Sequence, residues 1–421
     1  MAEDNEETIQ ALHKNLVDQV KAKGFMPSRH VETAFRAVPR HLFLPNLPPQ
    51  EVYQDKAIIT KSVDGHFVSS SSQPTIMAIM LEQLDLHKGQ HILEIGAGTG
   101  YNAALIAHIV GKTGHVVTID IDEDIVEDAR KNLVSAGFAS VQVVCADGGL
   151  GFPDAAPYDR IILTVNASDI TPAWHEQLTV EGRLLLPFSV RGPQIAVAFK
   201  RMGNHFESVS VQPCGFIGLR GAFAEQGLQV QLDRGPGQLY LTLSEQLPVH
   251  RSAISQWLSG PAQDIPTQVQ LTVHELFAGL HFWLALHEFG ICTLTARGSA
   301  IGRDIVLNLF PLLGNSSAYS TIGVLSQNAL SVLTYTVDQT EKTSVGGTLP
   351  ALSPVHIVVR TFGEDNELAQ HLVSLIERWN TLGRPNEQKL RIYAYMNEQT
   401  FVPDKQDIII KKHWTQFVFR W

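Results

Sequence analysis

Residues 91–104 read HILEIGAGTGYNAA, an apolar run that breaks into Gly96, Gly98 and Gly100 and continues into residues that favour helix. This order predicts a buried strand, a tight loop and a helix, because glycine tolerates backbone angles that other residues avoid. Dinucleotide-binding folds space their glycines as G-x-G-x-x-G, which lets the backbone approach a pyrophosphate. The spacing here is G-x-G-x-G and therefore does not indicate a dinucleotide site.

Strands and helices alternate on both sides of this loop. The expected strands cover residues 91–95, 115–120, 141–145, 160–165, 183–188, 194–200 and 206–212. The expected helices between them cover residues 101–110, 123–136 and 172–178. This alternation, closed by a β-hairpin, predicts an α/β fold with a doubly wound, mostly parallel sheet. Residues 6–38 are expected to form two capping helices in front of it.

A glycine-rich segment, residues 214–237, is interpreted as a domain boundary, giving domains 1–230 and 235–421. The second domain mixes apolar strands with a helical stretch at 276–287 and an amphipathic helix at 367–382, so we expect an α+β domain. It carries no nucleophile, metal or phosphate motif. We therefore expect it to recognise substrate or to build an oligomer.

Composition excludes several classes of protein. The 421 residues carry a formal charge of -10 and show no basic arm, which argues against a nucleic acid partner. The three cysteines lie far apart without metal-ligand spacing, so we expect no disulfide framework and no metal site. The N-terminal residues MAEDNEETIQ are acidic, and no apolar stretch is long enough to cross a bilayer. These features predict a soluble, cytoplasmic protein with no membrane partner.

The glycine loop and two later acids resemble the S-adenosylmethionine site of class I (Rossmann-like) methyltransferases. Glu94 precedes the loop, and Asp120 ends the next strand, where it can accept both ribose hydroxyl hydrogens. Asp147 ends the third strand, where it can lie near the adenine amino group. Ligands of such sheets bind at the carboxyl ends of strands, where all three elements meet.

The resemblance implies S-adenosyl-L-methionine as cofactor. The expected cofactor-binding residues are Ser72, Glu94, Gly96, Ala97, Gly98, Thr99, Gly100, Tyr101, Asn102, Asp120, Ile121, Asp147 and Gly148. Structural alternatives stay open for some of them. Glu94 can instead cap a neighbouring backbone, and Tyr101 and Asn102 can instead pack at the start of the helix.

Further stretches resemble the protein L-isoaspartate O-methyltransferases, from about residue 8 to residue 220. They are AVPRHLFLP (37–45), VYQD (52–55), SSSQP (70–74), LEIGAGTGY (93–101) and APYDRII (156–162). Family members carry a Thr-x-Ser-x-Pro stretch whose serine lies beside the methyl donor and the substrate carboxylate, and Ser72 matches that serine. The sequence departs from the family at Ser70, where threonine is usual, and at 56–59, where KAII replaces Pro-Leu-Pro-Ile. The substrate pocket is therefore expected to differ.

The resemblance implies that Ser72 is catalytic and that Ser70, Ser71, Asn166 and Arg220 bind substrate. A carboxylate acceptor is already ionised near neutral pH, so the reaction needs no strong general base. Catalysis then depends on positioning and desolvating the carboxylate, for which a serine hydroxyl is suited. The alternative for the serine run is a solvated flexible loop.

The long second domain bears on the substrate. Similar two-domain proteins accompany ribosomal peptide biosynthesis, where a relative methylates an aspartate of a precursor peptide and the ester then forms a succinimide or isoaspartate. We expect this function, with a protein or peptide substrate and a possible homo-oligomer. The alternatives are general isoaspartate repair, methylation of a small-molecule carboxylate, and a non-catalytic binding protein with an inert methyltransferase fold.

Overall fold

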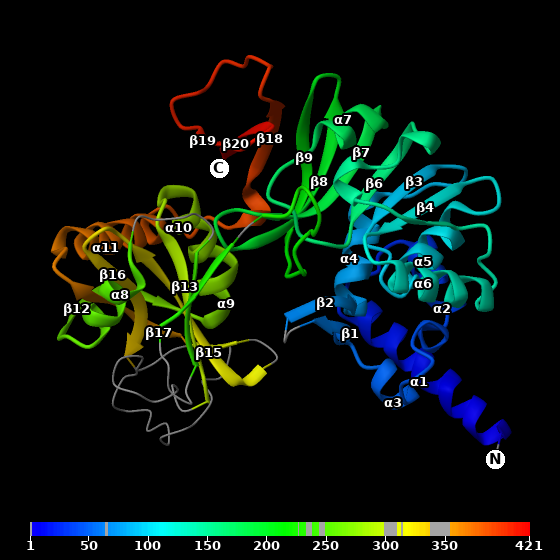
Figure 1. The fold of residues 1–421 in the computed structure, drawn as a ribbon, viewed down its shortest axis with the longest axis horizontal. Helices are drawn as coiled ribbons and strands as arrows, with labels where there is room; N and C mark the ends of the chain where they lie inside the picture. The colour runs from blue at the N-terminus through cyan, green and yellow to red at the C-terminus, as the bar shows by residue number, and fades with distance from the viewer. Residues whose placement is uncertain are drawn as a thin grey trace. The chain divides into compact units, whose positions relative to one another are not determined.

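The computed structural model describes residues 2–63, 66–225, 227–232, 238–243, 249–298, 310–312, 315–336 and 354–421 (Figure 1). Contacts divide the chain into two compact units. Unit 1 comprises Met1–Phe188, Gln194–Glu225 and Arg391–Arg420. Unit 2 comprises Ser189–Pro193, Gln226–Leu390 and Trp421. Among the described residues, no helix is long and apolar enough to cross a membrane.

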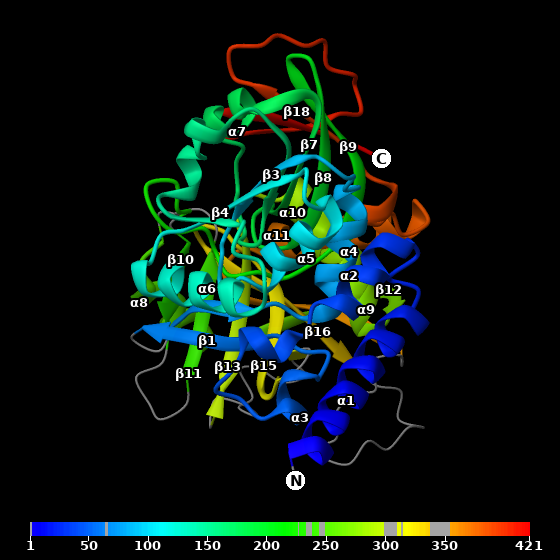
Figure 2. The ribbon, with the colours of Figure 1, turned by 90° about the vertical axis from the view of Figure 1, so that its right-hand side faces the viewer.

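Helices and one hairpin precede the main sheet of unit 1. They are α1 (Ala2–Ala22), α2 (Arg29–Ala37), the 3₁₀ turn η1 (Arg40–Phe43), α3 (Pro49–Val52), β1 (Ile58–Val63), β2 (His66–Ser71) and α4 (Pro74–Leu84). The helix α2 buries Val31 and Phe35, which stand four positions apart on one face. This face packs with α1, α4 and α5 (Tyr101–Val110) in one apolar core, and Figure 2 shows these helices together.

The sheet of unit 1 is built as the alternation of strands and helices predicts. Its further elements are β3 (His91–Ile95), β4 (His115–Asp120), α6 (Glu123–Ser135), β5 (Gln142–Cys145), the 3₁₀ turns η2 (Gly148–Leu150) and η3 (Pro153–Ala155), β6 (Tyr158–Leu163), α7 (Pro172–Gln177), β7 (Leu178–Ser189), β8 (Gln194–Met202) and β9 (His205–Pro213). The strands β5, β4, β3, β6 and β7 are parallel neighbours, and β8 and β9 form the antiparallel hairpin. The expected doubly wound α/β sheet is confirmed.

The end of the chain returns to this sheet. It contributes β18 (Arg391–Met396), β19 (Ile408–Lys411) and β20 (Thr415–Arg420), so the full order is β19-β20-β18-β9-β8-β7-β6-β3-β4-β5. Ala394 of β18 pairs with Phe206 of β9, and Phe417 of β20 buries its ring against Phe188. The observed division therefore differs from the expected domains 1–230 and 235–421, because apolar strand pairing draws residues 391–420 into unit 1.

Unit 2 is an antiparallel sheet with helices. Its elements are β10 (Leu228–Gln231), β11 (Gln238–Leu243), α8 (Arg251–Leu258), β12 (Ala262–Leu271), α9 (Val273–Glu275), the π-helical turn η4 (Leu276–Leu280), α10 (His281–His287), β13 (Ile291–Arg297), β14 (Phe310–Leu312), β15 (Asn315–Leu325), β16 (Ala329–Thr336), β17 (Val355–Gly363), α11 (Asn366–Thr381) and the 3₁₀ turn η7 (Glu387–Lys389). Both sheet faces are covered: Leu333 packs in the core with α10 and α11, whereas its neighbour Val332 packs in the core with α8. The expected α+β character of the second domain is confirmed.

Candidate functional site

The glycine loop follows β3 and requires its glycines. Gly96, Gly98 and Gly100 have φ of +100°, +50° and +86°, in the region that favours glycine. A Cβ on Gly96 would lie 2.5 Å from Thr164 Oγ1, so a side chain there would collide with the end of β6. The amides of Gly96 and Ala97 donate to the Ile119 carbonyl at 2.8 and 2.9 Å. These contacts fix the loop at the carboxyl ends of β3, β4 and β6.

Asp120 lies at the end of β4 beside this loop. Its Oδ2 accepts a hydrogen bond from the Gly98 amide at 3.1 Å, and its Oδ1 accepts one from the Ile121 amide at 2.9 Å. Burial raises the pKa of Asp120, while the amide donors and the charge of Arg220 act in the opposite direction. The carboxylate is thus held in one orientation, with further acceptor capacity on both oxygens.

A cavity of about 530 Å³ opens between these elements, all within unit 1. Three groups of residues line it: the hairpin and the start of α4, the ends of the parallel strands, and the loop after β9. They are Ala57, Ile59, Val68, Ser69, Ser70, Ser72, Gln73, Ile76, Ile95, Gly96, Gly98, Ile119, Asp120, Ile121, Gly148, Thr164, Val165, Gln194, Pro213, Cys214, Gly215, Phe216, Ile217, Gly218, Leu219 and Arg220. The cavity lies where ligands of doubly wound sheets bind.

The serine run, residues 69–72, forms the end of β2 and continues one residue past it. Ser69, Ser70 and Ser72 line the cavity. Ser71 is outside the lining and is buried, and its Oγ accepts a hydrogen bond from Arg40 at 3.3 Å. The solvated-loop alternative does not describe Ser71, which is buried. The substrate-binding role expected of Ser71 has no support from its position, because Ser71 is outside the cavity lining and its Oγ contacts Arg40.

Arg40 holds the serine run in place. Its guanidinium is fully buried and donates to five carbonyl oxygens of residues 52–56 and 71–72. The contact with the Ser72 carbonyl is 3.0 Å long. The sequence contained Arg40 in the family-like stretch 37–45, but nothing in the local pattern indicated that it contacts the serines.

Asp55 fixes the other side of the run. It accepts hydrogen bonds from the amide and hydroxyl of Thr75, at the start of α4, at 2.9 and 2.6 Å. Burial acts to raise the pKa of Asp55, but the hydrogen bonds from Lys23 and Thr75 outweigh it and lower the pKa. The stretch VYQD thus anchors the helix that follows Ser72.

Several expected cofactor residues support the loop from outside the cavity. Glu94 is fully buried and accepts hydrogen bonds from Asn102 Nδ2 at 2.7 Å and Thr118 Oγ1 at 2.6 Å. Burial raises the pKa of Glu94 to about 7. Tyr101 packs its ring against Phe43 at the start of α5. Tyr101 and Asn102 thus make the packing contacts at the start of the helix that were their structural alternative, whereas Glu94 contacts side chains rather than the neighbouring backbone that its alternative named.

Other residues expected to bind the cofactor also lie outside the cavity lining. Ala97, Thr99 and Gly100 are outside the cavity lining, and the Thr99 carbonyl accepts a hydrogen bond from Asn132 at 3.0 Å. Gly148 lines the cavity, whereas Asp147 does not. Asp147 accepts hydrogen bonds from the amides of Gly149 at 2.9 Å and Ala222 at 2.7 Å, so it fastens the loop after β9.

The two remaining substrate candidates lie on that loop or pair with it. Asn166 is outside the lining, and its backbone exchanges hydrogen bonds with Ile217 and Leu219 at 2.8 and 2.7 Å. Arg220 lines the cavity but directs its guanidinium to Asp122, at 3.0 and 3.1 Å.

The loop of residues 213–220 is a wall of the cavity, although its sequence pattern indicates part of a domain boundary. Its glycines resemble those of a linker. The structure fastens it instead: the Gln194 side chain accepts from the Phe216 amide at 2.7 Å and donates to the Phe216 carbonyl at 3.2 Å. A possible signal was the family likeness, which continues to about residue 220.

The cavity suits S-adenosylmethionine. Asp120 offers carboxylate oxygens for ribose hydroxyls, and Gly96 and Gly98 leave bare backbone beside them. The volume is within the range of about 300–1,000 Å³ that is usual for small-molecule sites. Among the described residues, no cluster of histidine, cysteine and acidic side chains is arranged to hold a metal.

Comparison with known proteins gives a consistent result. A model of the family "Protein-L-isoaspartate(D-aspartate) O-methyltransferase" matches residues 11–223. The chain is 37% identical over 228 residues to a protein-L-isoaspartate O-methyltransferase of Hyperthermus butylicus, covering 52% of this chain and 92% of that protein. It is 39% identical over 170 residues to the corresponding protein of Thermotoga maritima, covering 40% of this chain and 53% of that protein.

A solved structure extends the likeness in fold. It is titled protein-L-isoaspartate O-methyltransferase, and it aligns with a TM-score of 0.50 and 23% identity over 90% of this chain and 96% of its own. The fold likeness therefore continues beyond the residues that the family model matches. With the family match over 11–223 and the similarity to most of the Hyperthermus protein, the chain belongs to the protein-L-isoaspartate O-methyltransferase family of S-adenosylmethionine-dependent enzymes.

Proposed function

We propose that the chain methylates the carboxylate of an isoaspartyl residue in a protein or peptide. The observation that carries this proposal is the make-up of the cavity. Asp120 and the glycine loop form one side, and the hydroxyls of Ser70 and Ser72 come from the hairpin on another. The site thus combines a place for a nucleoside with hydroxyl donors for a carboxylate.

The ionisable groups of the lining agree with a carboxylate acceptor. The described lining residues with ionisable side chains are Asp120, Arg220 and Cys214. Burial raises the pKa of the Cys214 thiol, which keeps it protonated. A lining without histidine or lysine suits an acceptor that is already ionised and needs no proton removed.

Each side chain then has a simple task. The cofactor supplies an electrophilic methyl group. Asp120 accepts hydrogen bonds from ribose hydroxyls, and Ser72 orients the acceptor carboxylate by donating its hydroxyl hydrogen. Arg40 fixes the backbone of Ser72, so that the hydroxyl is held before the substrate arrives, which reduces the entropy lost on reaching the reactive geometry.

A narrower substrate is an aspartate of a ribosomally made precursor peptide, with succinimide or isoaspartate as the later product. The reason for considering a precursor peptide is the length of the chain beyond residue 230. One solved structure titled protein-L-isoaspartate O-methyltransferase aligns over 90% of this chain, which weakens that reason, because length does not separate this chain from that protein. We therefore place isoaspartyl substrates first and the precursor second. The fold of unit 2 suits either a substrate-holding or an oligomer-forming role.

The test compares two peptides that differ only in having isoaspartate or aspartate at one position. We expect base-labile methyl ester on the isoaspartyl peptide, and about tenfold less for Ser72→Ala because a positioning group is lost. Ser62→Ala is the matched control, since Ser62 lies on the same hairpin, is exposed and is outside the lining. Ester on the aspartyl peptide alone would favour the precursor, and ester on neither would overturn the proposal.

A further inference from the structure

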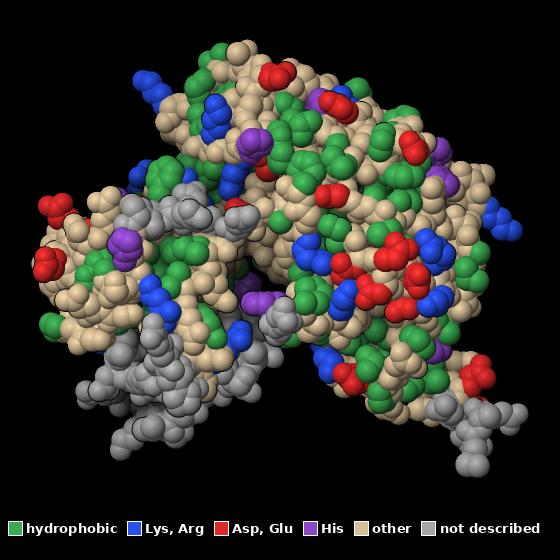
Figure 3. All heavy atoms as spheres, viewed as in Figure 1, with side chains coloured by type: hydrophobic (Ala, Val, Ile, Leu, Met, Phe, Trp, Pro, Cys, Tyr) green, Lys and Arg blue, Asp and Glu red, His purple; other side chains and the backbone are tan. Residues whose placement is uncertain are grey.

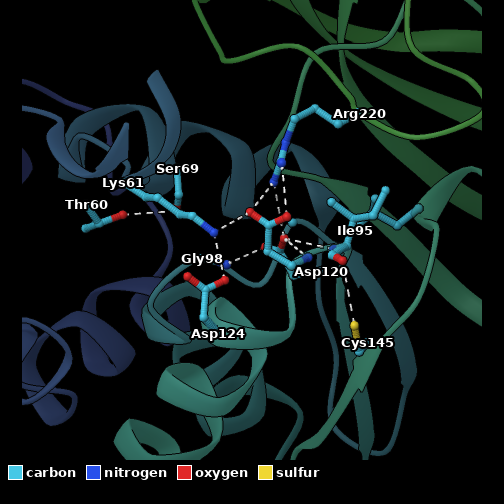
Figure 4. A network of polar contacts seen from close by, with 12 residues as sticks. Thr60, Lys61, Ser69, Ile95, Gly98, Asp120, Asp124, Cys145 and Arg220 are labelled. Atoms are coloured by element: carbon cyan, nitrogen blue, oxygen red, sulfur yellow. Dashed lines mark hydrogen bonds and ion pairs between the residues drawn. The ribbon is translucent and has the colours of Figure 1, made fainter. Parts of the chain in front are cut away.

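Two basic side chains, one from the hairpin β1–β2 and one from the loop after β9, meet at one carboxylate. Lys61 of β1 donates to Asp122 Oδ2 at 2.8 Å, and Arg220 donates to both Asp122 oxygens at 3.0 and 3.1 Å. Lys61 also donates to Asp124 Oδ1 at 2.7 Å, and Arg220 Nη2 lies 3.9 Å from Asp120 Oδ1. Figure 4 shows Lys61 and Arg220 extending toward the region of Asp120 from different directions.

The position of Asp122 makes this arrangement informative. Asp122 is the N-cap residue of α6, where an aspartate normally accepts a hydrogen bond from the first turn of the helix. Its side chain makes no such cap hydrogen bond and is directed to the two cations instead. Lys61 lies at an irregularity in the pairing of β1 with β2, which can redirect a side chain out of the regular register.

The two walls differ in how they are fastened. The loop after β9 is tied at several points: Phe216 to Gln194, Gly218 beside Asn166, and Ala222 to Asp147. The strands β1 and β2 form a sheet of their own, and Arg40 ties only its end at Ser71. Lys61 provides ion pairs from the other half of the hairpin to α6.

We infer that Lys61 and Arg220, joined through Asp122, are positioning residues that hold the serine-bearing hairpin against the cofactor site. Lys61 and Arg220 do not contact the reacting atoms. They affect the rate at which the cofactor dissociates. The Lys61–Asp122–Arg220 bridge connects the wall that carries Ser70 and Ser72 to the fixed loop on the far side of Asp120. The inference rests on the proposed function only in that the cavity holds the cofactor.

The exposure of the bridge suggests how it can be detected. The side chains of Lys61, Asp122 and Arg220 are 28%, 21% and 35% exposed, so salt can reach them. Figure 3 shows acidic and basic side chains interspersed on the surface over α6, where the bridge ends. Partly exposed ion pairs are weak singly, and their strength falls as the ionic strength rises.

The experiment replaces Lys61 by methionine, which keeps the length of the side chain and removes its charge. One readout is the rate at which S-adenosylhomocysteine leaves the full-length protein, at low and at high salt. We expect Lys61→Met to speed release by roughly threefold to tenfold at low salt. We also expect the variant to lose most of the salt dependence that the wild type shows.

The control is Lys131→Met, which removes the same charge from ion pairs within α6 at 3.4 and 3.9 Å, outside the cavity lining. It should release at the wild-type rate. The double variant Lys61→Met with Asp122→Asn should speed release by less than the two separate effects combined, because the two residues act through one bridge.

A second readout uses the free protein, so it does not depend on the cofactor. Amide hydrogen exchange in β1 and β2 should be faster in Lys61→Met and unchanged in Lys131→Met. Wild-type release and wild-type exchange in Lys61→Met would overturn the inference. If the wild type fails to bind S-adenosylhomocysteine, the proposed function fails, and the exchange readout alone then decides whether Lys61 fastens the hairpin.

Discussion

Arg40→Met should loosen the serine run. The side chain is completely buried, and its two shortest hydrogen bonds reach the carbonyls of Val52 and Ser72 at 2.9 and 3.0 Å. Hydrogen bonds from a charged donor contribute about 1.5–3 kcal/mol each. Burial lowers the pKa of Arg40, which reflects the cost of desolvating its charge, and methionine removes that cost. Counting only the two short bonds at the lower value, we expect a loss of about 3 kcal/mol.

Hydrogen exchange followed by peptide mass spectrometry is the suitable assay, since it reports each segment separately in a chain with two units. A loss of about 3 kcal/mol corresponds to roughly a hundredfold faster exchange in β2 and at the start of α4. Arg36→Met is the control: Arg36 is 36% exposed and pairs with Asp18 and Glu32, so less than about 1 kcal/mol is expected. If exchange in Arg40→Met changed no more than in Arg36→Met, the role given to Arg40 would be refuted.

Two further predictions concern the glycine loop. The pKa of Glu94 is raised by burial from 4.5 to about 7, so the folded state holds its proton more tightly than the unfolded state. The contribution of this proton to the free energy of unfolding is complete below pH 4.5 and is lost as the pH rises through 7, by about 3 kcal/mol. Glu94→Gln should therefore flatten the pH dependence of the free energy of unfolding between these pH values. An unchanged profile would contradict the raised pKa of Glu94. Gly96→Ala would place a Cβ 2.5 Å from Thr164 Oγ1 at a φ of +100°, and calorimetry should show cofactor binding weakened by on the order of tenfold. Gly24→Ala, with a φ of +84° and no atom within 4 Å, tests the backbone strain without the collision and should bind as the wild type does.

The sequence predicted the centre of the first unit well. The strands 91–95 and 115–120 and the helix 101–110 have the expected bounds, because β-branched runs and glycines mark them locally. Asp120 was placed by the same reasoning, since a residue at the end of a parallel strand must lie at the ligand edge of the sheet. The role of Asp120 as a ribose ligand stays a prediction.

Other features depend on contacts that local patterns do not contain. The expected strands do not include the hairpin β1–β2, because its polar residues show neither helical nor strand periodicity. The return of residues 391–420 to the first sheet requires pairing of Tyr393 with Glu207, far apart in sequence. The roles of Arg40 and Glu94 depend on the side chains that surround them, which become neighbours only after folding.

The central claim is that the cavity beside Asp120 holds S-adenosylmethionine, and calorimetric titration of the full-length protein tests it most directly. Asp120→Ala removes the carboxylate that accepts a hydrogen bond from the Gly98 amide and lines the cavity. We predict that the wild type binds with one site per chain. Asp120→Ala should bind more weakly by on the order of 2 kcal/mol, about thirtyfold. Equal affinity in the two proteins, or no binding by the wild type, would contradict the account.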